Sequence, residues 1–447
     1  MRVNYKNTSL ISENEIAGKV LELKEYLRKL NEVAMVGGYD ASEASINLPA
    51  DESFLKKAKA FAKDKKTKKL KYVVVIGIGG SNLGTQAVYE AIYGTLNIAL
   101  KSKDPKMIFL DTNNPKLMFD VQDILSDVKD KEEIVVNIIS KSGSTTETVA
   151  NFEVLYQFLK KRIDGIEERV VTTTDFGSKL WQKAEEKSFA VLEIPKNVGG
   201  RYSVFSSVGL FPLALCGVDV KSLLGGARLM RDECLNEDFQ KNPALASAIL
   251  TFLHYKKGAN ISNSFFFHSQ LETIGRWYRQ LMGESIGKEK DKNGNVVHIG
   301  ITPIISIGST DLHSMAQLFL GGPKDKFTTF VNTEFQKSKV AVPKKMIFDG
   351  LVEHLNGKDF SEIMRAIYEG VKIAYQKNKA PFMEIILPDL SESSIGQFLQ
   401  FKMMEMIFLA ELLNVNAFDQ PNVEDYKKET KEILKINNDF RRNRTTD

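Results

Sequence analysis

Two stretches of the chain decide its fold: VVVIGIGGSNLG at residues 73–84 and IVVNIISKSGSTTET at residues 134–148. In each of them a run of branched apolar residues, typical of a buried parallel strand, leads directly into a loop of Gly, Ser and Thr. The backbone N–H groups and hydroxyls of such a loop, together with the positive end of the helix that follows, attract an anion. Two such loops in one chain predict that both meet over one phosphorylated ligand.

The rest of the chain alternates apolar strands with helical segments. This alternation predicts right-handed βαβ units, and therefore an α/β fold with mainly parallel sheets that are covered by helices on both faces. A second block of the same architecture is expected to follow the first. The first block is expected to hold strands at 72–76, 106–110, 134–139, 170–173 and 190–194, and the second at 264–267, 301–307, 328–332 and 383–387.

Shorter signals complete the expected secondary structure. Ser12 and Glu15 form a capping-box pattern at the start of an N-terminal helix. Asn293-Gly294 marks a hairpin turn, and a last helix is expected at 423–436. The uncharged run 202–218 is interrupted by Pro, Gly and Ser, so it is interpreted as a buried helix and not as a membrane span.

Composition narrows the class of protein. The 447 residues are 43% hydrophobic and 26% charged, which is ordinary for two or three globular domains. The net charge of +4 is mild and spread along the chain, so neither a nucleic-acid surface nor a membrane association is expected. The chain has only two cysteines, Cys216 and Cys234, and no apolar signal core near its start, which fits a cytoplasmic location.

The first glycine-rich loop fails two nucleotide motifs. A nucleotide P-loop would need lysine where Thr85 stands, and the dinucleotide fingerprint would need glycine where Asn82 stands. These mismatches disfavour ATP and dinucleotides. A small phosphoester, held by hydroxyls and backbone amides, remains.

A candidate acid–base group lies in the segment LETIGRWYRQLMGESIGK at 271–288. Gln280 and Glu284 are four residues apart and therefore share one helix face. Glu284 lies at the predicted helix end, where its carboxylate can point into a cleft, although an exposed helix carboxylate is the alternative. The five histidines show no metal-ligand spacing, so no metal is expected.

Three further segments supply candidates that would each be unremarkable alone. Arg201 follows two glycines that let the backbone approach a ligand, and its guanidinium could meet an oxyanion. His313 follows a Gly-Ser-Thr loop and is expected to open a helix. Gln420 and Lys427 are seven residues apart, so they are expected to lie on nearly one face of a helix.

In combination and order, these segments closely resemble the phosphoglucose isomerase family. The resemblance spans nearly the whole chain and is closest to the compact bacterial form. It is carried by GIGGSNLG at 77–84, SKSGSTTET at 140–148, VGGRYS at 198–203, GESIGK at 283–288 and FDQPNVE at 418–424.

The resemblance implies two sugar-isomerase (SIS) αβα sandwich domains at 49–215 and 216–419, with an N-terminal helical arm at 1–48 and a C-terminal helical arm at 420–447. It also implies a homodimer without metal or organic cofactor that interconverts glucose 6-phosphate and fructose 6-phosphate.

The same resemblance assigns roles to single residues. Glu284 would shuttle a proton between C2 and C1, Arg201 would steady the enediolate, and His313 and Lys427 would assist ring opening, with His313 supplied by the partner subunit. The residues expected to contact the substrate and its phosphate are Gly80, Ser81, Ser140, Lys141, Ser142, Thr145, Gln280 and Gln420.

Two other functions remain open at this point. One is a sugar-phosphate-sensing regulator built on SIS domains, although the chain shows no helix-turn-helix segment. The other is an isomerase for a related phosphosugar such as mannose 6-phosphate.

Overall fold

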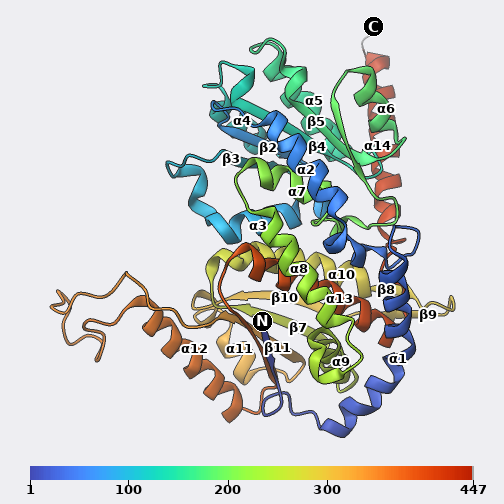
Figure 1. The fold of residues 1–447 in the computed structure, drawn as a ribbon. Helices are drawn as coiled ribbons and strands as arrows, with labels where there is room; N and C mark the ends of the chain where they lie inside the picture. The colour runs from blue at the N-terminus through green and yellow to red at the C-terminus, as the bar shows by residue number, and fades with distance from the viewer. Residues whose placement is uncertain (445–447) are drawn as a thin grey trace.

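A computed structural model describes the main chain of residues 1–444 and the side chains of residues 1–436, and it contains two five-stranded sheets (Figure 1). The first sheet is entirely parallel and has the strand order β3-β2-β4-β5-β6. Four of its strands have the predicted bounds and the fifth extends two residues further. They are β2 (Tyr72–Ile76), β3 (Lys106–Leu110), β4 (Ile134–Ile139), β5 (Val170–Asp175) and β6 (Ala190–Ile194).

The second sheet has the order β1-β12-β11-β7-β10, in which only β1 runs antiparallel. The strand β1 was not predicted, because three residues carry no readable period. The predicted hairpin is present as β8 and β9. The strands of the second sheet are β1 (Arg2–Asn4), β7 (Ile261–Phe266), β10 (Thr302–Ile307), β11 (Lys326–Thr333) and β12 (Phe382–Leu387). β8 (Lys288–Lys290) and β9 (Val296–Ile299) form a separate two-stranded sheet.

Helices cover both faces of each sheet, as the strand alternation predicted. The Ser12 capping box starts α1, and the run 202–218 contains the buried helix α7. The helices are α1 (Glu13–Val36), α2 (Glu52–Lys65), α3 (Leu83–Tyr93), α4 (Pro115–Leu125), α5 (Thr146–Lys160), α6 (Lys179–Glu186), α7 (Ser207–Leu215), α8 (Val220–Cys234), α9 (Pro243–Lys256), α10 (Glu272–Ile286), α11 (Ala316–Gly321), α12 (Phe360–Lys377), α13 (Glu392–Leu412) and α14 (Val423–Arg444).

The side-chain alternation of the central strands explains this layering. In β2, Val74 and Ile76 face a cluster that includes residues of α4 and α5, while Val73 and Val75 face the main core. That main core continues through α7, α8, α9 and α13 to one face of the second sheet, and a third cluster beneath α11 and α12 covers the other face. The α/β fold class is therefore confirmed. Because one apolar core runs through both sheets, the boundaries between 49–215 and 216–419 stay a prediction.

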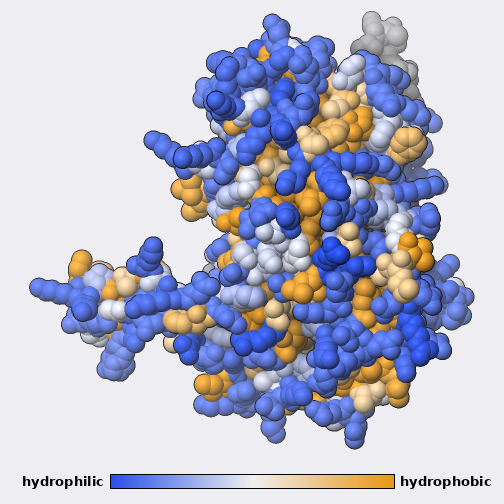
Figure 2. All heavy atoms as spheres, viewed as in Figure 1, coloured by the Kyte–Doolittle hydropathy of each residue, from blue (hydrophilic) through white to orange (hydrophobic). Residues whose placement is uncertain are grey.

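One segment departs from the compact body. Residues 334–359, between β11 and α12, form an arm that projects far from the sheets at the left of Figure 1. Figure 2 shows apolar atoms on this arm among polar ones. Ile347 is 95% exposed, Leu351 77% and Phe348 73%.

Among residues 1–444, none of the helices combines the length and the apolar character that crossing a membrane requires.

Candidate active site

The first glycine-rich loop begins where β2 ends. Gly77 is buried and donates its N–H to the carbonyl of Leu110 on the neighbouring strand. The chain then turns through Gly79 and Gly80 in a short 3-10 helix before α3 begins at Leu83. Gly79 has φ of 59°, a left-handed conformation that favours glycine. The loop therefore presents main chain, without side-chain bulk, at the carboxyl edge of the first sheet.

The second loop, residues 140–145, follows β4, which is the direct neighbour of β2. Ser140 is buried, and its hydroxyl lies 2.9 Å from that of Thr145. Ser142 and Ser144 are exposed, with hydroxyls 3.4 Å apart. Thr145 precedes α5 and its side chain makes no capping bond to that helix. The hydroxyls thus line the start of α5, where the helix dipole is positive.

Lys141 lies within this second loop and is half-buried. Burial lowers the pKa of Lys141, Asp175 acts in the opposite direction, and Arg201 lowers it further. Lys141 is therefore within electrostatic reach of both the carboxylate at the end of β5 and the arginine of the next loop. The phosphate-loop candidates and Arg201 share one region of the molecule.

Arg201 is the most highly connected side chain of this region, although it is only 1% exposed. Its Nη1 donates to Glu284 Oε2 at 3.1 Å and to the side-chain oxygen of Gln420. Its Nε donates to the hydroxyl of Ser285 at 3.0 Å. Its Nη2 donates to the carbonyls of two residues in the segment before α14, Ala417 and Asp419. One buried cation thus joins α10 to the C-terminal segment.

Glu284 lies on α10 with its side chain 30% exposed, so the carboxylate is open to a ligand. Its Oε1 accepts a hydrogen bond at 3.0 Å from Gln280, which confirms that the two side chains share a helix face. Gln280 in turn lies against the first loop, because a Cβ on Gly79 would be 2.9 Å from Gln280 Nε2. The carboxylate, a buried guanidinium and the glycine-rich loop therefore surround one position.

Gly80 shows how closely the first loop approaches the turn that carries Arg201. A Cβ at position 80 would overlap the main chain of Gly200 and the amide nitrogen of Arg201. We expect Gly80→Ala to push the first loop away from the turn that carries Arg201. A displacement of about 1 Å typically lowers kcat/KM by about 100-fold, and we expect a loss of that size or more.

Gly225→Ala is the matched control, because a Cβ at that helical position would have nothing within 4 Å. It should leave kcat/KM unchanged and raise the free energy of unfolding by up to about 1 kcal/mol. Steady-state kinetics and thermal unfolding of both variants would check this, and equal kinetics for the two would contradict the close-contact argument.

The structure does not bring two of the predicted residues into this cluster. His313 is exposed and lies in the turn between a 3-10 helix and α11, so the prediction that it opens a helix is wrong. Lys427 pairs with Glu424 at 2.7 Å on α14. The prediction that Gln420 and Lys427 share a helix face is also wrong, because α14 begins only at Val423. Gln420 precedes that helix, and its side-chain oxygen accepts a hydrogen bond from Arg201.

Several residues of the cluster escaped the sequence analysis. Ser285 accepts from Arg201 and its hydroxyl lies 2.9 Å from that of Tyr202, while Lys288 contacts both Glu284 and Asp419. Lys288 carried a readable signal, since it follows Glu284 by four residues in GESIGK. Asp419 carried none, because its partner is 131 residues away.

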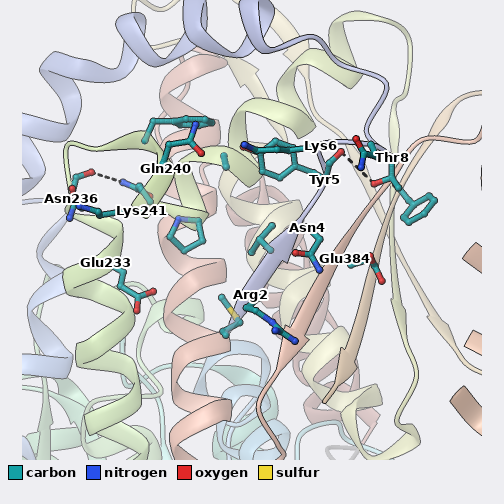
Figure 3. A pocket seen from close by; sticks show the side chains of 18 of the residues that line it. Arg2, Asn4, Tyr5, Lys6, Thr8, Glu233, Asn236, Gln240, Lys241 and Glu384 are labelled. Carbon is teal, nitrogen blue, oxygen red and sulfur yellow. Dashed lines mark hydrogen bonds between the residues drawn. The ribbon is translucent and has the colours of Figure 1, made fainter. Parts of the chain in front are cut away.

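A cavity of about 970 Å³ lies elsewhere, between β1, the 233–246 segment and α12 (Figure 3). Its lining mixes charges of both signs, and it contains none of the predicted site residues. It is therefore separate from the Arg201 cluster. Within the described residues, no group of three His, Cys, Asp or Glu side chains is placed to hold a metal ion.

Comparison with known proteins gives the family. The family model described as phosphoglucose isomerase matches residues 26–446. The chain is 39% identical to a glucose-6-phosphate isomerase of Methanocaldococcus jannaschii, over 80% of this chain and 82% of that protein. It is 32% identical to a glucose-6-phosphate isomerase of Fusobacterium nucleatum over 94% and 92% of the two chains.

Solved structures agree with this assignment at the level of the fold. The chain superimposes on a hypothetical protein of Thermus thermophilus with a TM-score of 0.83 and 29% identity, covering 97% and 99% of the two chains. It superimposes on a glucose-6-phosphate isomerase from Chlamydia trachomatis with a TM-score of 0.80 and 22% identity, covering 97% and 88%. The match over residues 26–446, together with the relatives that are 39% and 32% identical, establishes that the chain belongs to the phosphoglucose isomerase family.

Proposed function

We propose that this chain is an aldose–ketose isomerase that interconverts glucose 6-phosphate and fructose 6-phosphate. The observation that carries the proposal is the contact of Glu284 with both Arg201 and Gln280 beside the first glycine-rich loop. The family match over residues 26–446 supports the same conclusion. A carboxylate can move a proton between neighbouring carbons while a fixed positive charge stabilises the intermediate, and this cluster holds both groups.

The substrate phosphate is assigned to the two loops at the carboxyl edge of the first sheet. Hydroxyls, main-chain amides and the start of α5 suit a dianion there. Phosphate binding fixes the sugar so that C1 and C2 lie against Glu284, and the energy of that distant contact is used for positioning. The residues proposed to hold the phosphate are Gly80, Ser81, Ser140, Lys141, Ser142 and Thr145.

The proton transfer itself is assigned to Glu284. Its carboxylate takes the proton from C2 of the opened aldose and returns it to C1, so one residue serves both half-steps. Between the two half-steps negative charge develops on the substrate oxygens, and Arg201 stabilises it because a guanidinium is permanently charged. The hydroxyl proton of O2 passes to O1 in the same interval, which completes the conversion. Gln280 and Gln420, which contact Glu284 and Arg201 respectively, are proposed to contact the substrate as well.

Ring opening is assigned to His313 and Lys427, which lie outside the Arg201 cluster in the single chain. Proton transfer to the ring oxygen and from O1 needs groups that reach the sugar from another side. We propose that the protein is a homodimer and that His313 reaches the site of its partner. Exposed apolar side chains on the 334–359 arm support a contact between two copies.

Mixed dimers would test this arrangement. When Glu284→Gln and His313→Ala subunits are refolded together, a heterodimer has one site with both intact residues if His313 acts across the interface. Random assembly should then restore about a quarter of wild-type activity, because half of the dimers are mixed and half of their sites are intact.

If His313 acted within its own subunit, every site in the mixture would carry one lesion and activity would stay at the level of the parents. The measurement is a coupled assay on the refolded mixture, with sedimentation to verify that dimers form. The separately refolded variants, combined afterwards without refolding, are the control.

Asp175 gives a pH-dependent prediction. Burial raises the pKa of Asp175 to about 6, although Lys141 and Lys196 act in the opposite direction. The carboxyl binds its proton more tightly in the folded state, so its destabilising effect appears as pH rises from about 4 to 6 and is complete above 6. Asp175→Asn should therefore raise the melting temperature at pH 7.5 and leave it unchanged near pH 3.5.

The same variant should bind 6-phosphogluconate several-fold more tightly at pH 7.5, because a negative charge beside the phosphate loop is removed. Calorimetric titration of both proteins at pH 7.5 would measure this. Asp164→Asn, in the loop after α5, is the control and should change neither quantity. Unchanged binding by Asp175→Asn would place the phosphate away from this loop.

The function is tested by a coupled assay that offers glucose 6-phosphate and mannose 6-phosphate separately. Preference for glucose 6-phosphate supports the proposal, and preference for mannose 6-phosphate would identify the related isomerase. A gel-shift with bulk DNA tests the regulator alternative, and no binding of DNA is expected.

We propose a cytoplasmic location, in keeping with two buried free cysteines.

A further inference from the structure

Lys288, the first residue of β8, is a buried cation that the mechanism above does not use. Its side chain is only 5% exposed. Its Nζ donates to the main-chain carbonyl of Glu284 at 2.9 Å, and to both the carbonyl and a carboxylate oxygen of Asp419, the latter at 2.9 Å. All three of these acceptors belong to residues at or next to the catalytic cluster.

The acceptors of Lys288 overlap with those of Arg201. The carbonyl of Asp419 accepts from Arg201 Nη2 at 3.2 Å and also from Lys288. The residue after it, Gln420, accepts from Arg201 through its side chain. Two buried cations therefore fix the short segment 417–420 against the last turn of α10, and that segment carries a proposed substrate contact.

The charge of Lys288 also reaches the catalytic carboxylate. Burial lowers the pKa of Lys288, Asp419 raises it, and Arg201 and Glu284 contribute with opposite signs. Lys288 is therefore electrostatically coupled to Glu284 in addition to its contact with the carbonyl of that residue. The charged groups around it are Asp419 from the C-terminal segment, Arg201 from the loop after β6 and Glu284 from α10.

We propose that Lys288, paired with Asp419, is a positioning residue for the isomerisation: it docks the segment that carries Gln420 onto α10 and supplies a second positive charge beside Glu284. This inference rests on the proposed function. A cation near a carboxylate favours its ionised form, which is the form that accepts the proton from the sugar. The Lys288–Asp419 pair thus fixes the geometry of the site and places a second cation next to it.

A purely structural role would give a different result from a positioning role. A structural ion pair would change stability and leave the pH dependence of catalysis where it was. A positioning role with a charge effect moves the acid limb of the pH–rate profile, and it does so with opposite signs for the two partners. Removing the positive charge of Lys288 should move the acid limb to higher pH. Removing the negative charge of Asp419 makes the surroundings of the site more positive and should move the acid limb to lower pH.

The experiment compares kcat, KM and the pH profile of kcat/KM for four variants on glucose 6-phosphate. Lys288→Met should lower kcat/KM about tenfold or more and move the acid limb upward by about half a pH unit. Lys288→Arg should restore the acid limb. Asp419→Asn, at a residue whose side chain is 51% exposed, should move the limb downward.

Lys292→Met is the matched control, since Lys292 lies in the same hairpin and pairs with Glu411 at the end of α13, away from the Arg201 cluster. Its acid limb should stay in place. An unmoved limb in both Lys288→Met and Asp419→Asn, or movement of both in one direction, would overturn the inference. If Lys288→Met does not fold, Asp419→Asn tests the inference by itself: movement of its acid limb to lower pH supports the inference, and an unmoved limb overturns it. An inactive wild-type protein would instead overturn the proposed function, and this inference with it.

Discussion

Glu284→Gln is expected to lose at least about 1,000-fold in kcat while the protein still binds 6-phosphogluconate. Glutamine keeps the size of the side chain and can still meet Arg201 and Gln280 through its amide, so the site should stay assembled. It cannot accept a proton from carbon, and a positioned acid–base group typically contributes between about 100-fold and 10,000-fold to the rate. Loss of kcat without loss of binding is therefore the signature of the base.

The measurement combines a coupled isomerase assay with calorimetric titration of 6-phosphogluconate. Glu272→Gln is the control: Glu272 lies in the first turn of the same helix and pairs with Arg276, and both side chains are about half exposed. It should keep wild-type kinetics. If Glu284→Gln retained more than a tenth of wild-type kcat, another group would have to move the proton.

Arg201→Lys is expected to lower kcat about 100-fold or more. Lysine keeps the charge, but it cannot reproduce the fork of donors that contacts Glu284, Gln420, Ser285 and two main-chain carbonyls. Loss of one aligned donor to a developing oxyanion typically costs about 3 kcal/mol in the activation free energy. The lost contacts to the 417–420 segment should raise KM as well.

Stability should fall together with activity, because buried carbonyls left without a donor cost about 1–3 kcal/mol. Arg231→Lys is the control, since Arg231 is another buried arginine but lies on α8 beside Asp232. It should lower stability without lowering kcat. If both variants lowered kcat equally, the effect of Arg201 would be a general consequence of losing a buried guanidinium.

Local sequence was sufficient for most of the secondary structure. The strand β2 was predicted with its observed bounds because a short run of β-branched apolar residues ends in a glycine-rich loop. The pairing of Gln280 with Glu284 was predicted because helical spacing places them on one face. The short antiparallel β1 was missed. It exists only through its pairing with β12, more than 370 residues away, and three residues hold no period of their own.

The candidate site was predictable to the extent that each part lies in a short motif. The two loops, Arg201, Gln280 and Glu284 were all identified from such motifs. The contact between Lys288 and Asp419 was not, because the two residues are 131 positions apart. The helical placement of Gln420 was wrong, because this residue precedes α14 and its side chain accepts a hydrogen bond from the buried guanidinium of Arg201.

The sequence by itself determined the α/β architecture, the order along the chain of all the strands except β1, and the loops that suit a phosphate. These properties follow from periods and residue types within a few positions of each other. Only the tertiary structure decided that Arg201 meets Glu284 across 83 residues and the Gln420 segment across 219. A buried charge without a partner is strongly destabilising, and the groups available to pair with it depend on how the whole chain packs.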